Sequence, residues 1–323
     1  MSDREEKTGK NDNGKKNKGG KRNKIVAIEM IILVLLIMAA VAIFIQRDKS
    51  VKEAAKIHNQ KSKKTEQTSQ AAQKENEIEE ETEGTEEETG DRDASVPDRS
   101  NFAVQPGVSV GTTEQSDEKI VYLTLDDGPS DNTQAVLDIL DKYNAKATFF
   151  VTGEMPEYKD MIKAAYDKGH TIGMHTYSHD YAKVYVSVDA YFQDLDQIGQ
   201  MVQEEIGYVP CFIRFPGGSS NTVSKKYTAG IMSTLVQEVQ NRGYQYYDWN
   251  GSSGDGSVRT TEELVAQATS FDSNNIILLC HDSHGKQTTV EALPQIIEHY
   301  QSLGYTFKAL DRDSFVAHHG VNN

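Results

Sequence analysis

Two histidines, His175 and His179, lie four residues apart, and this spacing places both imidazoles on one side of a turn. Imidazole nitrogens in that arrangement suit a first-row divalent metal ion. The pair alone is a weak signal, because two surface histidines at this spacing are common. A carboxylate from another strand end would complete a set of two histidines and one carboxylate. Such a set leaves coordination positions open and is typical of a catalytic metal.

The doublet Asp126-Asp127, at the end of an apolar run, offers that carboxylate. Neighbouring residues on a strand point to opposite sides, so two adjacent carboxylates at a strand end approach a site from different directions. One could bind a metal while the other accepts a proton. The structural alternative is that one of them caps the following helix, although Ser130 or Asp131 could serve equally well.

The chain from about residue 118 onward alternates short β-rich apolar runs with amphipathic stretches. Strands are predicted at 119–125, 147–152, 171–174, 211–215, 244–248, 276–280 and 305–310. Helices are predicted at about 132–143, 157–168, 189–206, 225–242, 261–271 and 289–303. This alternation favours an α/β fold with a parallel sheet, here a distorted (β/α)7-8 barrel.

Titratable residues stand where several of these strands end. Besides the aspartate doublet and the histidine pair, they include Arg214, Asp248 and His281. Chemistry in such barrels lies at the carboxyl ends of the strands, so these side chains are expected to converge there. Cys211 and Cys280 are expected to be free, buried thiols that face the helix layer. Two cysteines also exclude a disulfide-dense scaffold and a cysteine-based zinc ribbon.

The amino-terminal part of the chain has a different composition. Residues 1–24 carry nine Lys/Arg against four acids, and residues 25–45 are apolar except for Glu29. Twenty-one residues span about 30 Å as a helix, so a transmembrane helix is predicted, with the basic flank cytoplasmic and the rest of the chain outside. A cleaved signal peptide is the alternative, but its apolar region is shorter, about 7–15 residues, and ends in a small-x-small site.

Residues 46–117 are polar and include an acidic run at 75–93. No apolar periodicity supports a core there, so a disordered spacer is expected, with cation binding by the acidic run as the alternative. The catalytic domain is expected at 118–317, followed by a tail at 318–323. The net charge of −15 makes nucleic acid an unexpected partner, and no obligate protein partner is evident.

Taken in order, these residues resemble the motifs of polysaccharide deacetylases of the NodB-homology type, carbohydrate esterase family four. The five counterparts are TLDDGP at 124–129, HTYSH at 175–179, RFPGG at 214–218, DW at 248–249 and LCH at 279–281. The third motif of that family often reads Arg-Pro-Pro, then an aromatic residue and Gly. Phe215 and Gly217 depart from it here, and Leu125 replaces the usual Phe of the first motif.

The resemblance implies a divalent metal held by Asp127, His175 and His179, with zinc the expected ion and other first-row ions the alternative. Such an ion lowers the pKa of water toward about 7 and polarises a carbonyl. By the same resemblance, Asp126 is the general base and His281 is the general acid that protonates the departing amine.

The remaining site residues follow from the same resemblance. Arg214 is expected to pair with Asp126, while Asp248 orients His281 or neighbours Arg214. The substrate-binding set is expected to be a backbone N–H in the turn at Pro216 and Gly217, with Trp249 and Leu279 around the acetyl methyl.

Together with the predicted anchor, these residues indicate an extracellular, single-pass membrane enzyme that deacetylates N-acetylated sugars of peptidoglycan. Other acetylated surface polysaccharides, such as capsule, chitin-like polymers or xylan, are the alternatives within the family. A catalytically inactive glycan-binding protein is the alternative from another class, and it should lack a metal ligand, the base or the acid. None of these residues is missing from the sequence.

Overall fold

The computed structural model describes residues 99–322, which belong to a compact unit that runs from Asp91 to Asn323. The transmembrane helix expected at 25–45 lies outside the described residues, as does the greater part of the expected spacer. Among residues 99–322, no helix combines the length and the apolar character that crossing a membrane requires.

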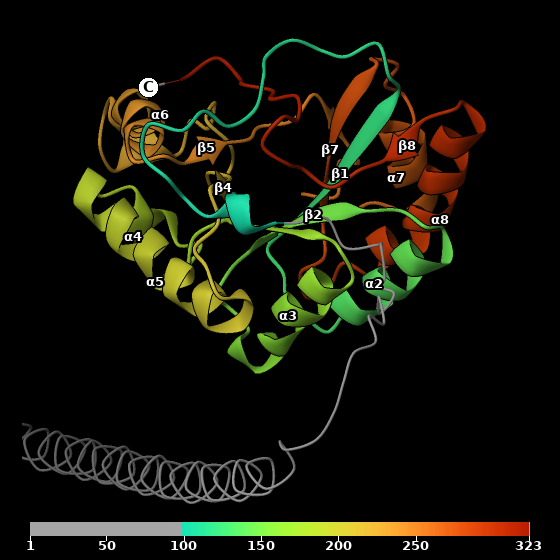
Figure 1. The fold of residues 1–323 in the computed structure, drawn as a ribbon, viewed down its shortest axis with the longest axis horizontal. Helices are drawn as coiled ribbons and strands as arrows, with labels where there is room; N and C mark the ends of the chain where they lie inside the picture. Colours follow the sequence, from blue (N-terminus) through green and yellow to red (C-terminus); the bar gives the residue numbers. More distant parts are fainter. Residues whose placement is uncertain (1–98, 323) are drawn as a thin grey trace, which may run out of the picture. The chain divides into compact units, whose positions relative to one another are not determined.

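A single curled sheet of parallel-paired strands forms the centre of this unit (Figure 1). Its strands are β1 Ile120–Asp126, β2 Ala147–Val151, β3 Thr171–Met174, β4 Phe212–Ile213, β5 Gln245–Tyr246, β6 Gly251–Ser252, β7 Asn275–His281 and β8 Thr306–Phe307. They follow the order β5-β4-β3-β2-β1-β7-β6, and β8 also pairs with β1. Because β5 and β6 form the two ends of this order and do not pair, the sheet is a half-barrel and not a closed barrel.

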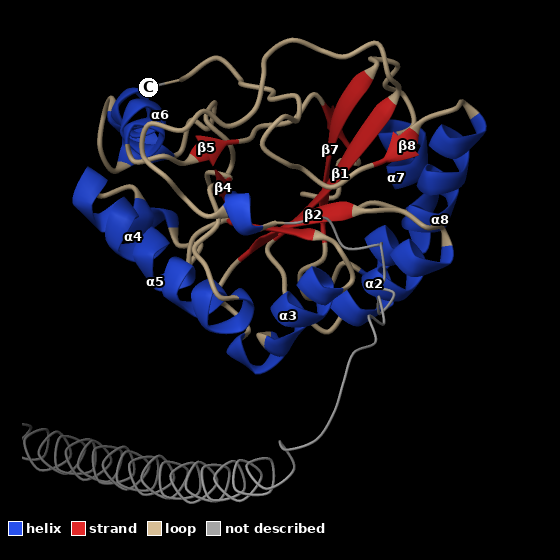
Figure 2. Ribbon diagram, in the orientation of Figure 1, coloured by secondary structure: helices blue, strands red, loops and turns tan. Residues whose placement is uncertain are grey.

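Helices cover the outer face of the sheet (Figure 2). The α-helices are α2 Thr133–Lys142, α3 Asp160–Asp167, α4 Tyr181–Val184, α5 Val188–Ile206, α6 Ile231–Asn241, α7 Thr261–Ala268 and α8 Gln287–Ser302. Three short 3-10 helices, η1 Ser100–Phe102, η2 Pro156–Tyr158 and η3 Ser224–Lys226, complete the set in the described chain. Each α-helix of eight or more residues is amphipathic and buries its apolar stripe against the strands.

Side chains on β1 alternate between two apolar cores. Leu123 and Leu125 pack in the cluster under the helices, whereas Tyr122 packs in a second cluster on the concave side of the sheet. The two cysteines are free and buried, as expected, but they divide between these cores. Cys280 lies on the helix side and Cys211 lies in the concave cluster, because β4 spans only two residues and the alternation does not extend back to residue 211.

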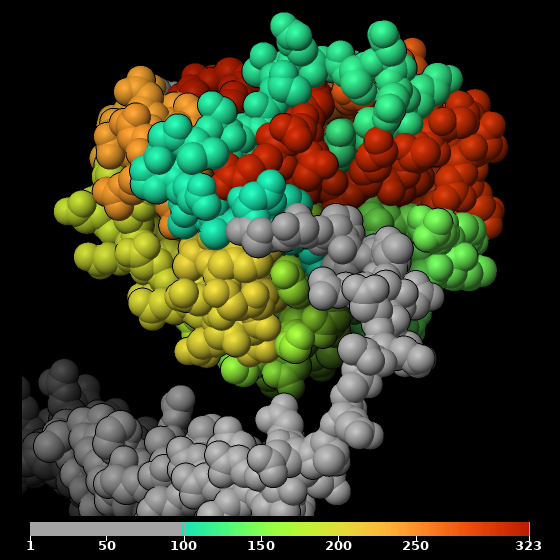
Figure 3. Space-filling model, in the orientation of Figure 1, coloured from blue at the N-terminus to red at the C-terminus, as the bar shows by residue number. Residues whose placement is uncertain are grey.

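The segment before β1 packs against the barrel although it was expected to be spacer. The guanidinium of Arg99 lies over the Tyr166 ring and donates hydrogen bonds to the carbonyls of Tyr166 and His170. The backbone of Ala103 pairs antiparallel with Pro210. Figure 3 shows this segment beside the carboxy-terminal one, where Arg312 donates to the carbonyl of Ala103. The packed unit therefore begins well before residue 118.

This packing predicts a measurable stability contribution from Phe102, which is buried and packs edge-on against Phe212 with ring centroids 5.2 Å apart. Phe102→Ala should lower the free energy of unfolding by about 3–5 kcal/mol, because it leaves a cavity in the concave core. Urea unfolding followed by circular dichroism measures the change. Val108→Ala, in the same segment but 45% exposed, is the control. Equal free energies of unfolding in the two variants would show that this segment does not stabilise the domain and belongs to the spacer.

Candidate active site

The end of β1 presents two carboxylates to the same side of the molecule. Asp126 is the last residue of the strand and is buried. Asp127 follows with a φ of 67°, in the left-handed region that non-glycine residues rarely adopt. This backbone conformation breaks the alternation of the strand, so the second carboxylate also faces the site. Strained backbone of this kind is common at functional positions.

Asp127, His175 and His179 form a compact group that we call the metal cluster. Their ligand atoms all lie within 4.8 Å of one another, and both Nε2 atoms are 3.4 Å from Asp127 Oδ1. His175 donates its Nδ1 hydrogen to the carbonyl of Arg214 at 2.7 Å, which leaves the Nε2 lone pair free. Asp127 Oδ1 is buried without a hydrogen-bond partner. A divalent cation would satisfy that oxygen, so the donor set fits the metal expected from the sequence.

The charge states of the cluster favour metal binding. Burial raises the pKa of Asp127, but the imidazoles of His175, His179 and His281 outweigh it, and the net pKa is lowered. Burial lowers the pKa of His175, against the opposing effect of the two aspartates. An ionised carboxylate and a neutral imidazole are the forms that coordinate a metal ion.

Arg214 forms a buried ion pair with Asp126, as the sequence predicts. Its Nη1 lies 2.7 Å from Asp126 Oδ1 and also donates to Thr124 Oγ1 at 2.8 Å. The Nε and Nη2 atoms donate to the backbone carbonyls of Tyr247 and Asp248. The guanidinium is fully buried, so every one of these bonds acts without competition from water. The pair fixes the orientation of the Asp126 carboxylate.

His281, the last residue of β7, faces the metal cluster from the neighbouring strand. Its Nε2 lies 3.9 Å from Asp127 Oδ2, while its Nδ1 donates to Asp255 Oδ1 at 2.8 Å. Asp255 Oδ2 accepts from the His281 backbone N–H at 2.7 Å and from Thr289 Oγ1 at 2.9 Å. Burial lowers the pKa of His281, but Asp255 and, to a smaller extent, Asp127 and Asp126 outweigh it and raise the pKa to about 9. Without a metal ion at the cluster, the imidazole is therefore protonated at neutral pH.

Of the two roles expected for Asp248, orienting His281 or neighbouring Arg214, the structure shows the second. The Asp248 carboxylate accepts from the backbone N–H and the hydroxyl of Ser219, and from the backbone N–H of His319. Only its carbonyl contacts Arg214. Asp255 orients His281 instead. The sequence does not reveal this residue, because it follows β6, a two-residue strand that no apolar run marks.

The expected substrate-binding residues border the same site. Gly217 is exposed, has a φ of 74°, and its backbone N–H makes no hydrogen bond within residues 99–322. Pro216 is buried beside it, with its carbonyl held by the Tyr185 hydroxyl at 2.8 Å. The Trp249 ring lies against Gly218. Leu279 is two residues before His281 on β7, so both occupy one face of the strand.

The expected tail at 318–323 also reaches this site. The ring of His319 donates through Nε2 to the carbonyl of Trp249 at 2.6 Å and accepts from Ser220 Oγ at 3.1 Å through Nδ1. Its backbone N–H binds the Asp248 carboxylate at 2.8 Å. We call residues 315–321 the carboxy-terminal strap. The strap joins the turn after β4 to the loop after β5, where the sheet is open.

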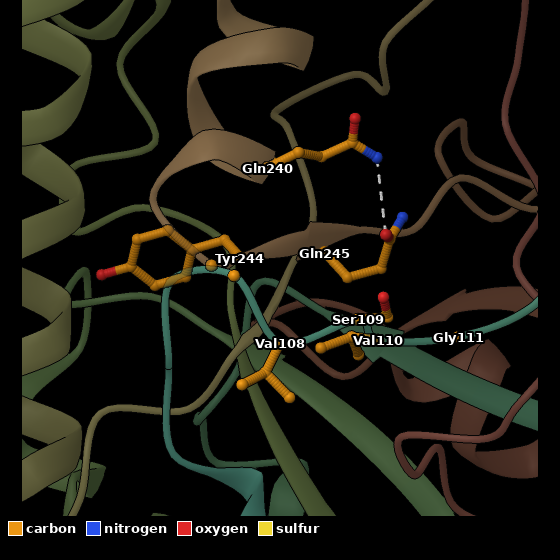
Figure 4. Close-up of a pocket in the computed structure, with 9 residues that line it drawn as sticks. Val108, Ser109, Val110, Gly111, Gln240, Tyr244 and Gln245 are labelled. Atoms are coloured by element: carbon orange, nitrogen blue, oxygen red, sulfur yellow. Dashed lines mark hydrogen bonds between the residues drawn. The ribbon is translucent and has the colours of Figure 1, made fainter.

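A separate cavity of about 390 Å³ lies between the segment 107–111 and the end of α6 (Figure 4). Its polar side chains are neutral, and Gln240 Nε2 donates to Gln245 Oε1 at 3.5 Å. Neither a carboxylate nor an imidazole lines it, so this cavity lacks the groups that hydrolysis requires.

An α/β half-barrel with a carboxylate–histidine cluster that fits a divalent metal, an oriented second carboxylate and a nearby histidine is the arrangement of a hydrolase. Residues 113–236 match the polysaccharide deacetylase family model. The catalytic domain of a peptidoglycan N-acetylglucosamine deacetylase from Eubacterium rectale is 47% identical with a TM-score of 0.63, covering 65% of this chain and 97% of that one.

Two Bacillus cereus proteins are also similar. The structure of a polysaccharide deacetylase is 30% identical with a TM-score of 0.53, covering 64% of this chain and 97% of that one. A peptidoglycan-N-acetylglucosamine deacetylase is 29% identical over 226 residues, 65% of this chain and 78% of that protein. The chain belongs to the polysaccharide deacetylase family. It is a hydrolase of carbon–nitrogen bonds other than peptide bonds.

The contact between His281 and Asp255 predicts how this imidazole titrates. In metal-free protein, the His281 ring should titrate near pH 9, and Asp255→Asn should lower that pKa. The variant loses the carboxylate that raises the pKa most and keeps the burial that lowers it, while Asp126 and Asp127 still raise it. NMR of histidine ring resonances measures both values. The Asp248→Asn variant should leave the His281 pKa in place, and an equal shift in both variants would contradict the assignment.

Proposed function

We propose that this protein removes acetyl groups from N-acetylated amino sugars of peptidoglycan, with zinc at the metal cluster. The observation that carries the proposal is the placement of Asp126 and His281 on adjacent strand ends beside that cluster, since β1 and β7 pair them in register. A carboxylate base and a protonated imidazole on either side of a metal site suit amide hydrolysis. The likeness to the Eubacterium rectale domain supports peptidoglycan as the polymer.

The ion, when bound, supplies a Lewis acid that polarises the acetamide carbonyl and acidifies water. Asp126 accepts the proton of the attacking water, and Arg214 holds its carboxylate in place through the ion pair between them. His281 then delivers its Nε2 proton to the departing sugar nitrogen, while Asp255 stabilises the imidazolium. The free N–H of Gly217 is available to the oxyanion that develops on the acetyl oxygen.

In this proposal, the side chains of Trp249 and Leu279 line the space that receives the acetyl methyl. The exposed position of Gly217 supports a groove open to a polymer at this point, because no side chain projects from it. All ligand, base and acid residues are present together, which favours the enzyme over an inactive glycan-binding protein.

We also propose that the enzyme acts outside the cell, held by a single membrane span at 25–45 and a polar spacer. The nine Lys/Arg residues before the span support this orientation. An enzyme anchored in this way meets the polymer of the wall within the reach of its spacer.

The substrate proposal predicts a mass change in the wall polymer. Purified peptidoglycan treated with residues 91–323 and zinc should yield muropeptides lighter by one acetyl group, and a chelator should prevent the change. This fragment retains Arg99 and its contacts. Mass spectrometry of the muropeptides identifies which sugar lost the group. If acetylated xylan or chitin oligomers release acetate and peptidoglycan does not, the proposed substrate is wrong but the proposed deacetylation reaction stands.

The proposed roles of the two neighbouring carboxylates predict different effects when each is replaced by asparagine. Asp126→Asn should retain metal and lose about 10²–10⁴-fold in kcat, because the amide oxygen still accepts from Arg214 but takes no proton. Asp127→Asn should lower metal affinity, and excess metal should partly restore its activity. Metal content and acetate release measure both effects, and each variant controls for the charge change in the other. Metal loss confined to Asp126→Asn would reverse the two roles.

A further inference from the structure

Gly217 stands where the third motif of this family often carries an aromatic residue, and the structure shows what fills the space. A Cβ atom at Gly217 would lie 2.5 Å from the hydroxyl oxygen of Tyr181 and 3.5 Å from its Cζ. The phenol therefore reaches the position at which a side chain of residue 217 would begin. The space beside the turn after β4 is thus occupied by an aromatic side chain from α4.

Contacts on several sides hold Tyr181 in this position. Asp180 caps α4 by accepting from the backbone N–H of Ala182 at 2.9 Å. The Tyr181 ring packs edge-on against His179, a member of the metal cluster, with centroids 5.8 Å apart, and against Tyr185 with centroids 5.5 Å apart. Tyr185 is in turn bound to the turn that contains Gly217. The phenol is thus held between the metal cluster and the turn that contains Gly217.

The hydroxyl of Tyr181 has no hydrogen-bond partner among residues 99–322, although the side chain is partly buried. Its oxygen is accessible to solvent, unlike the hydroxyl oxygens of Tyr191 and Tyr247, which are buried without a partner, so a ligand can reach it. The neighbouring N–H of Gly217 is also free. Two unused donors therefore lie side by side next to the metal cluster, where a glycan would present oxygen acceptors.

We propose that the Tyr181 hydroxyl donates a hydrogen bond to an oxygen of the bound amino sugar, and that this residue sets substrate preference at the position vacated by residue 217. The inference rests on the proposed function and adds a substrate contact from α4 to it. Because the hydroxyl makes no hydrogen bond within the described chain, the bond to the sugar gives a tyrosine at this position a role that phenylalanine lacks.

The test is Tyr181→Phe in the full chain, assayed with soluble glycan oligomers of peptidoglycan in the presence of zinc. We expect kcat/KM to fall about 10-fold, the value of one hydrogen bond to substrate. Metal content and melting temperature should stay unchanged, because the variant removes no contact within the protein. Tyr143→Phe, at the opposite end of the strands and bound to Glu298, is the control and should keep full activity. A kcat/KM of Tyr181→Phe equal to wild type would overturn the inference.

Binding separates this inference from the proposed function. Trp249 is the single tryptophan of the chain and lies against Gly218, so its fluorescence reports oligomer binding without turnover. If the wild type binds oligomers but releases no acetate, the proposed function fails. The inference then still requires a weaker Kd for Tyr181→Phe. An unchanged Kd would overturn it.

A double-mutant cycle tests the steric contact itself. Gly217→Ala places a Cβ at a positive φ in any background, but it meets the hydroxyl oxygen only when residue 181 is tyrosine. The loss of melting temperature caused by Gly217→Ala should therefore be smaller in the Tyr181→Phe background. Equal losses in the two backgrounds would show that the phenol does not occupy this space.

Discussion

The buried ion pair between Asp126 and Arg214 is the interaction on which the rest of the site depends. Removal of one partner from a buried pair leaves an uncompensated charge and typically costs about 3–5 kcal/mol. The Arg214 guanidinium is fully buried. It joins the end of β1 to the carbonyls of Tyr247 and Asp248. Three strand ends of the half-barrel are therefore held in one place by a single side chain.

The same arginine also acts on the metal cluster through its backbone. Its carbonyl accepts the Nδ1 hydrogen of His175, which fixes the tautomer and aims Nε2 at Asp127. The residue that orients the proposed base thus also orients one proposed metal ligand. A displacement of β4 would move both groups together, so the position of the proposed base relative to this ligand would change little.

Periodicity and strand-end chemistry were enough to predict the parallel sheet and to bring the metal cluster, Asp126, Arg214 and His281 to one end of it. Contacts made by irregular chain were not predictable. Asp255 follows a strand of two residues, and Tyr181 starts a helix of four, so neither has a periodic pattern around it. His319 reaches the site through the strap, whose position depends on side-chain contacts with Trp249 and Ser220 that no sequence pattern encodes.

The order of strands in the sheet constrains when this site can form in a growing chain. β1 lies between β2 and β7, and Asp126 is the register partner of His281. A ribosome delivers β1 through β5 long before β7, so the first strand keeps one edge unpaired during most of synthesis of the domain. Contacts this distant in sequence form late and slowly. Chains that end before β7 therefore lack His281, and the proposed acid joins the site only when nearly the whole domain has been made.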